Sequence, residues 1–335
     1  MQTKPYVVFL ITLLSACVVV GASAQSAQPE TTRTMKLADV RIRDPFILAD
    51  APTKTYYLIV SHGVVSGRGH NGVAALTSKD LETWQGPYSI FEVPDDFWGR
   101  QGVWAPEVHP YKGKYYLFTT FTSSERLAEQ WRNWLPRVKR GSQVLVADSP
   151  LGPYKPFQNR AHTPSDMMTL DGTLWVEDGV PYMVYCHEWV QIKNGTVEMI
   201  RLKDDLSDVE GEPAVLFHGS EAPWSRMSKQ YGSNVTDGPF LYRTRTGQLL
   251  MLWSSGGPSG YAEGIAVSQS GALKGPWTQI AEPLFKDDGG HGMIFRRFDG
   301  APMLLLHQPN RGPRERARLF ELEDTGDTIR IKTER

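Results

Sequence analysis

The sequence predicts an all-β protein, a five-bladed β-propeller with four-stranded antiparallel blades. A pair of apolar runs recurs five times, successive pairs begin 54 to 66 residues apart, and turn residues separate the runs. A repeat of this period is typical of propellers and other tandem arrays. Although a chain of 335 residues could hold two domains, the repeat favours one closed ring of five units.

The first run of each pair is short and follows or contains a polar residue. These runs are Asp44–Leu48, Ala105–His109, Asp171–Trp175, Asp237–Leu241 and His291–Phe295. The second runs are Tyr56–Val60, Tyr115–Thr119, Tyr182–Cys186, Leu249–Trp253 and Met303–His307. Because the first strand of a propeller blade runs nearest the axis, we expect the residues that begin the first runs to meet at one place.

Each unit offers four strand-like runs separated by turn residues. In the first unit they are Pro45–Ala49, Thr55–Ser61, Gly72–Ser78 and Tyr88–Val93, and in the fifth Met293–Phe298, Pro302–His307, Ala317–Glu321 and Thr328–Lys332. Hairpin turns are predicted at Lys112–Gly113, Asp178–Gly179, Thr246–Gly247 and Asp299–Gly300. Since the last unit supplies all four of its strands, we expect the ring to close by packing between blades.

The N-terminal residues predict export. Residues 1–24 read as a signal peptide, with Lys4, the apolar stretch Tyr6–Ala16 and the small residues Ala22–Ala24. Residues 25–35 are predicted to be a disordered linker, and 36–335 the propeller. Leu14–Cys17 resembles a lipobox, so a lipid anchor at Cys17 is the alternative to plain cleavage. The expected location is periplasmic, extracellular or the outer membrane as a lipoprotein, and no later apolar run reaches the ~20 residues of a membrane span.

Charge and cysteine content restrict the partners. With 36 basic and 37 acidic residues the formal net charge is −1, so no strong field attracts nucleic acid or an anionic surface. Cys186 remains the single cysteine after signal removal, and its apolar strand predicts a buried thiol. The segment Ser124–Arg140 interrupts the repeat and predicts a short amphipathic helix or a long loop, either on a binding rim or as a solvated flap.

Titratable residues open four of the five units: Asp44, Asp171, Asp237 and His291. Asp-Gly pairs are also turn signals. The pairs at 178 and 299, however, already occupy the predicted hairpin tips, whereas Asp171 and Asp237 precede innermost strands. We therefore predict that these four residues line a common site at the axis.

Five segments resemble signature segments of glycoside hydrolase family 43. They are Arg43–Phe46, Trp104–Glu107, Leu170–Gly172, Thr236–Tyr242 and Gly290–Gly292, in this order over nearly the whole mature chain. That family consists of five-bladed propellers that invert the anomeric centre, among them arabinofuranosidases, arabinanases and xylosidases. The resemblance implies an oligo- or polysaccharide substrate, with terminal α-L-arabinofuranosyl or β-xylosyl units of plant polysaccharides as the expected target.

The resemblance also implies residue roles. Asp44 matches the general base, Asp171 matches the carboxylate that orients the substrate and modulates the pKa of the acid, and Asp237 stands at the place of the general acid. His291 matches a histidine deep in the cavity that in some members helps to hold calcium. No cofactor is implied as required, and a structural calcium ion in the central cavity is compatible with the family.

Asp237 departs from the family, which usually has glutamate there. A carboxyl that is one methylene shorter would fall about 1 Å short of the glycosidic oxygen, and such a displacement is costly. Three outcomes follow: the backbone compensates, another carboxyl is the acid, or activity is lost. Glu188 is the best substitute, with a rim or structural carboxylate as its alternative role, and Glu107 is a weaker candidate.

An aromatic wall is expected around the sugar. Trp104, Trp189 and Trp253 are its predicted members, with Phe46 beneath the sugar ring, because sugars stack their C–H faces on aromatic rings; core packing is the alternative for each. Three rival functions stay open: a non-catalytic carbohydrate-binding propeller, a retaining enzyme of the fructan-hydrolase type, and an exo-galactanase-like activity.

Overall fold

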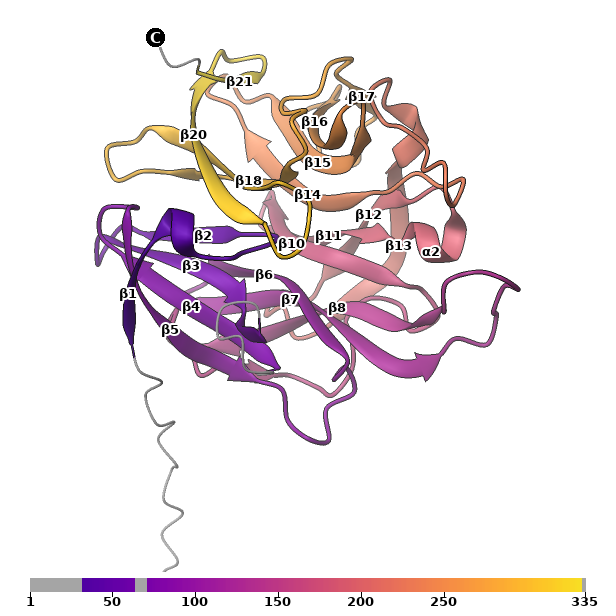
Figure 1. Ribbon diagram of the computed structural model, residues 1–335, viewed down its shortest axis with the longest axis horizontal. Helices are drawn as coiled ribbons and strands as arrows, with labels where there is room; N and C mark the ends of the chain where they lie inside the picture. Colours follow the sequence, from indigo (N-terminus) through magenta and orange to yellow (C-terminus); the bar gives the residue numbers. More distant parts are fainter. Residues whose placement is uncertain (1–31, 64–70, 333–335) are drawn as a thin grey trace, which may run out of the picture.

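Five antiparallel sheets surround one axis. The computed structural model describes residues 32–63 and 71–332, and in it the innermost strand of each sheet lies at the centre of the molecule (Figure 1). In four sheets the strands follow one another in sequence order from the axis outward, and in the fifth sheet β2 to β5 do so while β1 is added at the outer edge. The predicted five-bladed β-propeller is thus confirmed.

The blades have the following strands. Blade 1 contains β1 (Arg33–Lys36), β2 (Phe46–Asp50), β3 (Thr55–Ser61), β4 (Gly72–Ser78) and β5 (Thr83–Glu92), and blade 2 contains β6 (Gly102–Tyr111), β7 (Lys114–Arg126), β8 (Val138–Ala147) and β9 (Lys155–Pro156). Blade 3 contains β10 (Thr169–Glu177), β11 (Val180–His187), β12 (Thr196–Leu202) and β13 (Val209–His218). Blade 4 contains β14 (Asp237–Arg243), β15 (Leu249–Gly257), β16 (Gly260–Ser268) and β17 (Trp277–Gln279), and blade 5 contains β18 (Gly290–Arg296), β19 (Pro302–Gln308), β20 (Arg316–Asp324) and β21 (Ile329–Ile331).

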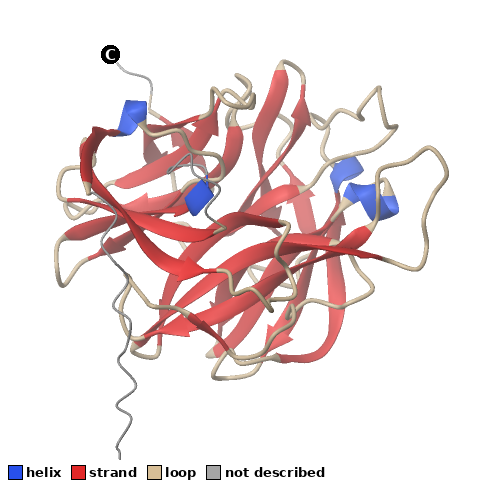
Figure 2. Ribbon diagram, turned by 60° about the horizontal axis from the view of Figure 1, so that its bottom comes forward, coloured by secondary structure: helices blue, strands red, loops and turns tan. Residues whose placement is uncertain are grey.

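Helices are few and short (Figure 2). The helical elements that lie wholly within the described residues are the 3-10 turns η1 (Leu37–Asp39) and η2 (Gly219–Glu221) and the four-residue helix α2 (Trp189–Ile192). The predicted insertion Ser124–Arg140 forms no helix, because β7 and β8 extend into it and leave only residues 127–137 as a loop. The loop alternative is therefore correct.

The hairpins between first and second strands follow their turn residues. Lys112 and Gly113 have φ of 47° and 79°, and Asp178 and Gly179 have φ of 51° and 80°. Positive φ at both central residues matches the twist of the flanking strands, and aspartate and glycine tolerate it well. These two-residue turns fix the register of β6 with β7 and of β10 with β11.

The hydrophobic core lies between the faces of neighbouring blades. One cluster joins blades 5, 1 and 2, for example through Leu305, Leu58 and Leu117, which are all fully buried. Further clusters lie between blades 2 and 3, 3 and 4, and 4 and 5. Cys186 is fully buried in the cluster between blades 3 and 4, as predicted.

The ring closes between blades 5 and 1 without strand exchange, as expected. Arg41 forms an antiparallel bridge with Arg316, and the Ile42 N–H donates to the Glu315 carbonyl at 3.3 Å. Blade 1 gains a fifth, outer strand because β1 pairs with β5. Residues 33–35, expected in a disordered linker, are thus part of a strand; the proposed signal peptide, Cys17 and residues 25–31 lie outside the described residues.

Candidate active site

The start of each innermost strand bends in the same way. In each of blades 2 to 5, two successive residues of the innermost strand are not paired with the second strand, and the first of the two has a left-handed backbone. In blade 1 the left-handed residue lies two positions before the start of β2. These left-handed residues are Asp44 (φ 51°), Ala105 (43°), Asp171 (57°), Gly238 (53°) and His291 (53°). A bulge redirects side chains out of the strict alternation of a strand, so two successive residues of a strand can face the axis.

This register corrects the expected position of Asp237. The left-handed residue of blade 4 is Gly238, and Asp237 lies one position earlier. Glycine is required at 238 because the His291 ring lies against it: a Cβ there would come within 2.7 Å of two ring carbons. The sequence repeat pairs Asp237 with Asp44 and His291, whereas in the structure Gly238 is the residue equivalent to these two.

The bulges are held by the preceding blade. Their backbone amides have left their own ladder and need other acceptors. They donate from Asp44 to His307 Nδ1 (3.3 Å), from Asp171 to Thr120 Oγ1 (2.8 Å), from Gly172 to Ser142 Oγ (2.9 Å), from Gly238 to Asp171 Oδ2 (2.9 Å), from His291 to Ser254 Oγ (2.7 Å) and from Gly292 to Glu263 Oε2 (3.0 Å). Asp44, Asp171 and His291 are thus fixed by a neighbouring blade as well as by their own.

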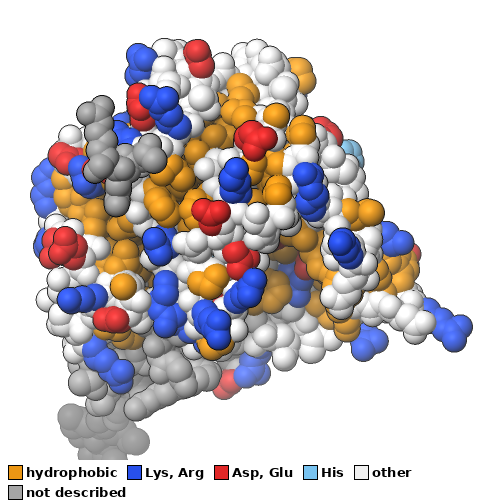
Figure 3. All heavy atoms as spheres, turned by 45° about the horizontal axis from the view of Figure 1, so that its top comes forward, with side chains coloured by type: hydrophobic (Ala, Val, Ile, Leu, Met, Phe, Trp, Pro, Cys, Tyr) orange, Lys and Arg blue, Asp and Glu red, His pale blue; other side chains and the backbone are white. Residues whose placement is uncertain are grey.

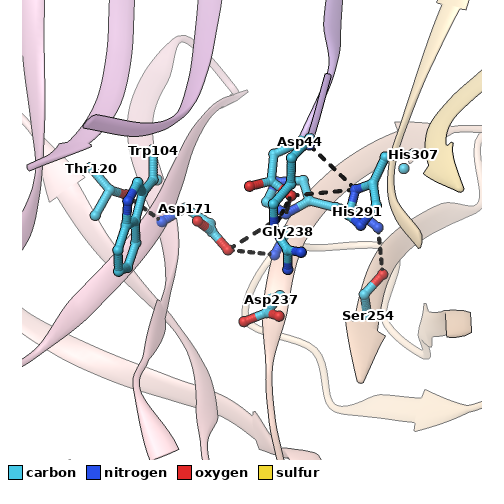
Figure 4. Close-up of polar contacts among 12 residues, drawn as sticks. Asp44, Trp104, Thr120, Asp171, Asp237, Gly238, Ser254, His291 and His307 are labelled. Atoms are coloured by element: carbon cyan, nitrogen blue, oxygen red, sulfur yellow. Dashed lines mark hydrogen bonds and ion pairs between the residues drawn. The ribbon is translucent and has the colours of Figure 1, made fainter. Parts of the chain in front are cut away.

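One cavity of about 270 Å³ opens at these bulges; we call it the carboxylate cavity. Its lining residues are Arg43, Asp44, Trp104, Leu170, Asp171, Glu188, Trp189, Asp237 and His291. Figure 4 shows Asp44, Asp171 and His291 converging, with Asp237 close by. The structure therefore brings together the four carboxyl groups that the sequence singled out, with two of the predicted tryptophans and the histidine.

Asp44 is held as an anion. The Nδ1 atom of His291 lies 3.1 Å from Asp44 Oδ1, and the Arg43 guanidinium lies 3.6 Å from the same oxygen. Burial alone would raise the pKa of Asp44, but these cations outweigh it and hold the pKa well below its usual range. The side chain keeps 14% of its surface exposed, so water can reach this carboxylate.

His291 is the cation that lies between Asp44 and Asp171. Burial opposes its charge, but Asp44 and Asp171, whose Oδ2 is 3.8 Å away, raise the pKa of His291 to about 10. His307 behaves in the opposite way, since burial lowers its pKa to about 4. A neutral His307 accepts the Asp44 amide at Nδ1 and donates from Nε2 to Asn310 Oδ1 (3.2 Å).

Asp171 and Asp237 have raised pKa values. Burial raises the pKa of Asp171 to about 7; His291 opposes this rise, and Asp237 and Asp44 reinforce it by like-charge repulsion. Burial also raises the pKa of Asp237, against the hydrogen bond that Tyr261 Oη donates to Asp237 Oδ2 at 2.7 Å. Both groups therefore hold a proton more readily than an exposed aspartate.

Glu188 reaches the cavity from blade 3, immediately before α2. Its carboxylate forms an ion pair with Arg140 Nη1, and the Arg140 guanidinium lies 4.1 Å from the centre of the Trp104 ring. Burial raises the pKa of Glu188, whereas Arg140 opposes the rise. Trp104 is 39% exposed, so its ring is available at the mouth of the cavity.

The blade 2 loop supports α2, which carries Trp189. Trp134 donates its indole N–H to the Val190 carbonyl at 2.6 Å and packs edge-on against Trp189, with ring centres 6.2 Å apart. Arg137 donates to the Gln191 carbonyl. The loop therefore satisfies carbonyl groups of a helix too short to be stable alone, and it lies at the rim of the site, one of the two expected places.

Three predicted residues lie elsewhere. Trp253 is fully buried between blades 3 and 4, where its indole N–H donates to Gln279 Oε1 at 2.9 Å. Phe46 packs edge-on against His109, with ring centres 5.1 Å apart, and lines a different cavity along the axis. Glu107 is buried and pairs with His109 Nε2 at 2.8 Å. The core alternative therefore describes Trp253 and Phe46, and Glu107 does not reach the carboxylate cavity.

Sequence reasoning missed four contributors: Arg43, Arg140, Tyr261 and His307. Arg43 precedes Asp44 and lines the same cavity. Its position in the segment Arg43–Phe46 could have indicated this role. His307 closes the second run of the last unit, next to the blade 1 bulge. Arg140 and Tyr261 carried no local signal, because each meets its carboxylate through a long-range contact.

The donor set does not fit a calcium ion at His291. Calcium takes oxygen ligands, whereas here an imidazole nitrogen lies between the aspartates, with His291 Nδ1 3.1 Å from Asp44 Oδ1 and 3.8 Å from Asp171 Oδ2. Within residues 32–63 and 71–332, no group of three or more His, Cys, Asp or Glu side chains is arranged to hold a metal ion.

The surface carries charges of both signs, interspersed over the face shown in Figure 3. This distribution agrees with the net charge of −1 and offers no broad basic surface for a nucleic acid on that face. In the part of the chain that the structure describes, no helix has the length and apolarity that crossing a bilayer requires.

Comparison with known proteins gives consistent matches. Residues 37–328 match the model of glycosyl hydrolases family 43. An endo-arabinase structure from Bacteroides thetaiotaomicron is 42% identical, with a TM-score of 0.77, and the match covers 86% of this chain and 96% of that one.

Two curated relatives are more distant. Alpha-L-arabinofuranosidase 43 of Humicola insolens is 24% identical over 65% of this chain and 44% of its own length. The extracellular exo-alpha-(1->5)-L-arabinofuranosidase of Streptomyces avermitilis is 24% identical over 85% of this chain and 58% of its own length. The chain thus spans about half the length of the curated relatives it matches. Its family match, its propeller and its ring of carboxyl groups agree: the chain belongs to glycosyl hydrolases family 43.

Proposed function

We propose that this protein is an exported glycosidase that hydrolyses the glycosidic bonds of α-L-arabinofuranosyl units with inversion, β-xylosyl units being the second candidate. One observation carries the proposal: a single cavity holds one carboxylate kept ionised and three carboxyl groups with raised pKa values. Glycoside hydrolysis needs such a division between an ionised base and a protonated acid.

Asp44 acts as the general base. As an ionised, partly exposed carboxylate it can take a proton from water while the water oxygen attacks the anomeric carbon. Asp171 modulates the acid, since a carboxyl of raised pKa beside another favours the proton on the pair. In an inverting reaction the base activates water on the face opposite the leaving group, so proton NMR of the first-formed sugar anomer tests the stereochemistry.

Asp237 is the proposed general acid. It receives a hydrogen bond from the neutral Tyr261, whereas Glu188 is paired with the permanent cation Arg140, which favours the ionised form. Proton donation matters most for a poor leaving group. We expect Asp237→Asn to lose about 10²–10⁴-fold in kcat on an alkyl glycoside and much less on a dinitrophenyl glycoside.

Glu188→Gln is the matched comparison for the acid. If Asp237 is the acid, this variant should lose activity evenly on both leaving groups, because it alters the cavity without removing the proton donor. The reverse pattern, with the leaving-group dependence in Glu188→Gln, would transfer the acid role to Glu188.

The proposed sugar follows from the relatives, three of which bear names that refer to arabinofuranosidase or arabinase activity. A screen of nitrophenyl α-L-arabinofuranoside, nitrophenyl β-xyloside, nitrophenyl β-galactoside and linear α-1,5-arabinan tests it. Highest kcat/KM on the galactoside would favour the exo-galactanase-like alternative.

A second candidate function is carbohydrate binding without turnover, and the aspartate at 237 favours it. Saturable binding of arabinopentaose with no product from any substrate would support that function. Export is proposed from residues 1–24 and from a relative described as extracellular. Mass spectrometry of the mature N-terminus distinguishes cleavage after Ala24 from lipidation of Cys17.

A further inference from the structure

A second cavity of about 200 Å³ lies beside the carboxylate cavity; we call it the Trp98 cavity. Its lining includes Trp98, Ser123, Lys139, Asn159, Arg160 and Ser165, and also Arg140. It is formed by the loop before β6, by β7 and β8, and by the connection from β9 to β10. None of the residues proposed for catalysis lines this cavity.

Arg140 connects the linings of the two cavities. The guanidinium group pairs with Glu188 and lies over Trp104, both of which line the carboxylate cavity. The same arginine lines the Trp98 cavity. A chain-like ligand that fills the first cavity and continues past Trp104 therefore reaches the second one across a single side chain.

The charge balance of the Trp98 cavity suits a neutral ligand. Each of its three basic side chains already has an acidic partner: Arg140 with Glu188, Lys139 with Glu125 at 2.6 Å, and Arg160 with Asp208 at 2.8 Å. A phosphate or carboxylate would have to displace one of these partners. A sugar hydroxyl can instead bond to the paired groups, which still carry free donors and acceptors.

The aromatic side chain of the cavity is held in place before any ligand binds. The Trp98 indole N–H donates to Gln143 Oε1 at 2.6 Å, and its backbone N–H donates to Asn159 Oδ1 at 2.9 Å. The ring also packs edge-on against Phe121, with centres 6.1 Å apart. A fixed aromatic ring among polar groups is typical of preformed sugar sites and lowers the entropy cost of binding.

We propose that the Trp98 cavity is a subsite for a further glycosyl unit of the same oligosaccharide whose scissile unit occupies the carboxylate cavity. This inference rests on the proposed function for the identity of the ligand. It predicts that the protein favours oligosaccharides over aryl monoglycosides, because only the longer ligand contacts both cavities.

Ser165→Trp tests the subsite by filling it. Ser165 is exposed and lines the Trp98 cavity, while the neighbouring Asp166 is exposed and does not, so Asp166→Trp is the matched control. We expect Ser165→Trp to lower kcat/KM on arabinopentaose and xylopentaose, whichever is turned over, by at least about 10-fold. Both variants should leave kcat/KM on the aryl monoglycoside within about 2-fold of the wild type.

The same pair is tested for binding in an Asp44→Asn background, which needs no turnover. Titration calorimetry with arabinopentaose and xylopentaose should show that Ser165→Trp weakens affinity by about 10-fold or more, while Asp166→Trp does not, at unchanged melting temperatures. Equal affinities for both variants would overturn the subsite. Failure of the proposed function appears differently, as an absence of turnover in the wild type whatever the two variants do to binding.

Discussion

The carboxylate cavity has two chemically different regions. On the side of blades 5 and 1, Asp44 lies next to His291 and Arg43 and stays ionised. On the side of blades 3 and 4, Glu188 and Asp237 have raised pKa values. Burial raises the pKa of all three carboxyl groups, so burial alone cannot separate them. At Asp44 the neighbouring cations outweigh burial, whereas at Glu188 and Asp237 burial outweighs the ion pair with Arg140 and the hydrogen bond from Tyr261. This division makes acid–base chemistry possible within one cavity.

The two regions also differ in their origin. Asp44 is one of the five left-handed residues that recur from blade to blade, and its backbone N–H donates to His307 of blade 5. Glu188 stands at the start of α2, which is supported by the loop that interrupts the repeat. The base thus belongs to the architecture common to all five blades, whereas Glu188 depends on an addition to one of them.

The largest expected effect comes from removing the base. Asp44→Asn should lower kcat by about 10²–10⁴-fold, because an amide cannot take a proton from water, and the melting temperature should not fall. Steady-state kinetics on the best substrate of the screen measures this effect. The exposed Asp39→Asn is the control and should keep wild-type activity; near-normal turnover of Asp44→Asn would end the assignment.

The next effect tests the cation that separates the two regions. In the wild type the depressed pKa of Asp44 places the acidic limb of the pH–activity profile below an ordinary aspartate pKa of about 3.9. His291→Gln removes the charge that lowers the pKa values of Asp44, Asp171 and Asp237, so both limbs should move to higher pH. Activity should fall by about 10²-fold, and the exposed His218→Gln should leave the profile unchanged. An acidic limb that stays in place in His291→Gln would show that His291 does not control Asp44.

A smaller effect, that of removing the Tyr261 hydroxyl, tests which carboxyl group is the general acid. Tyr261→Phe removes the hydrogen bond that opposes the raised pKa of Asp237, so that pKa should rise further. If Asp237 is the acid, the alkaline limb of the profile moves to higher pH. Arg140→Met acts in the same direction on Glu188 and should leave that limb in place; the opposite result assigns the acid to Glu188.

The smallest expected effect is that of metal removal. Because His291 supplies the positive charge among the aspartates, dialysis against EDTA should leave kcat and the melting temperature of the wild type unchanged. Added calcium should not change them either. A loss of activity that calcium restores would show that a metal ion takes part in the site.

The fold and half of the site could be predicted because they repeat. Periodicity placed Asp44, Asp171 and His291 correctly, since each occupies the same bend of its blade. It misplaced Asp237, because the Asp-Gly pair resembles that of blade 3 while the backbone aligns Gly238 with Asp171. The spacing of the repeats could not show where the side chains of Phe46 and Trp253 point, and both pack against neighbouring sheets.

Long-range partners were beyond the reach of sequence patterns. Arg140 of blade 2 pairs with Glu188 of the adjacent blade 3. Tyr261 lies on β16, two strands further from the axis than β14, which carries Asp237. Such pairs depend on how the sheets twist and stack. No local spacing indicates them, although they determine the charge of the carboxylates.

The five left-handed positions carry an evolutionary consequence. Glycine adopts this backbone freely, whereas other residues pay about 1–3 kcal/mol for it, and only blade 4 has glycine there. Selection for thermal robustness alone would drift Asp44, Asp171 and His291 toward glycine and erase the chemistry. Conversely, four of the five positions already carry a side chain and leave room for exchange, whereas the His291 ring confines position 238 to glycine.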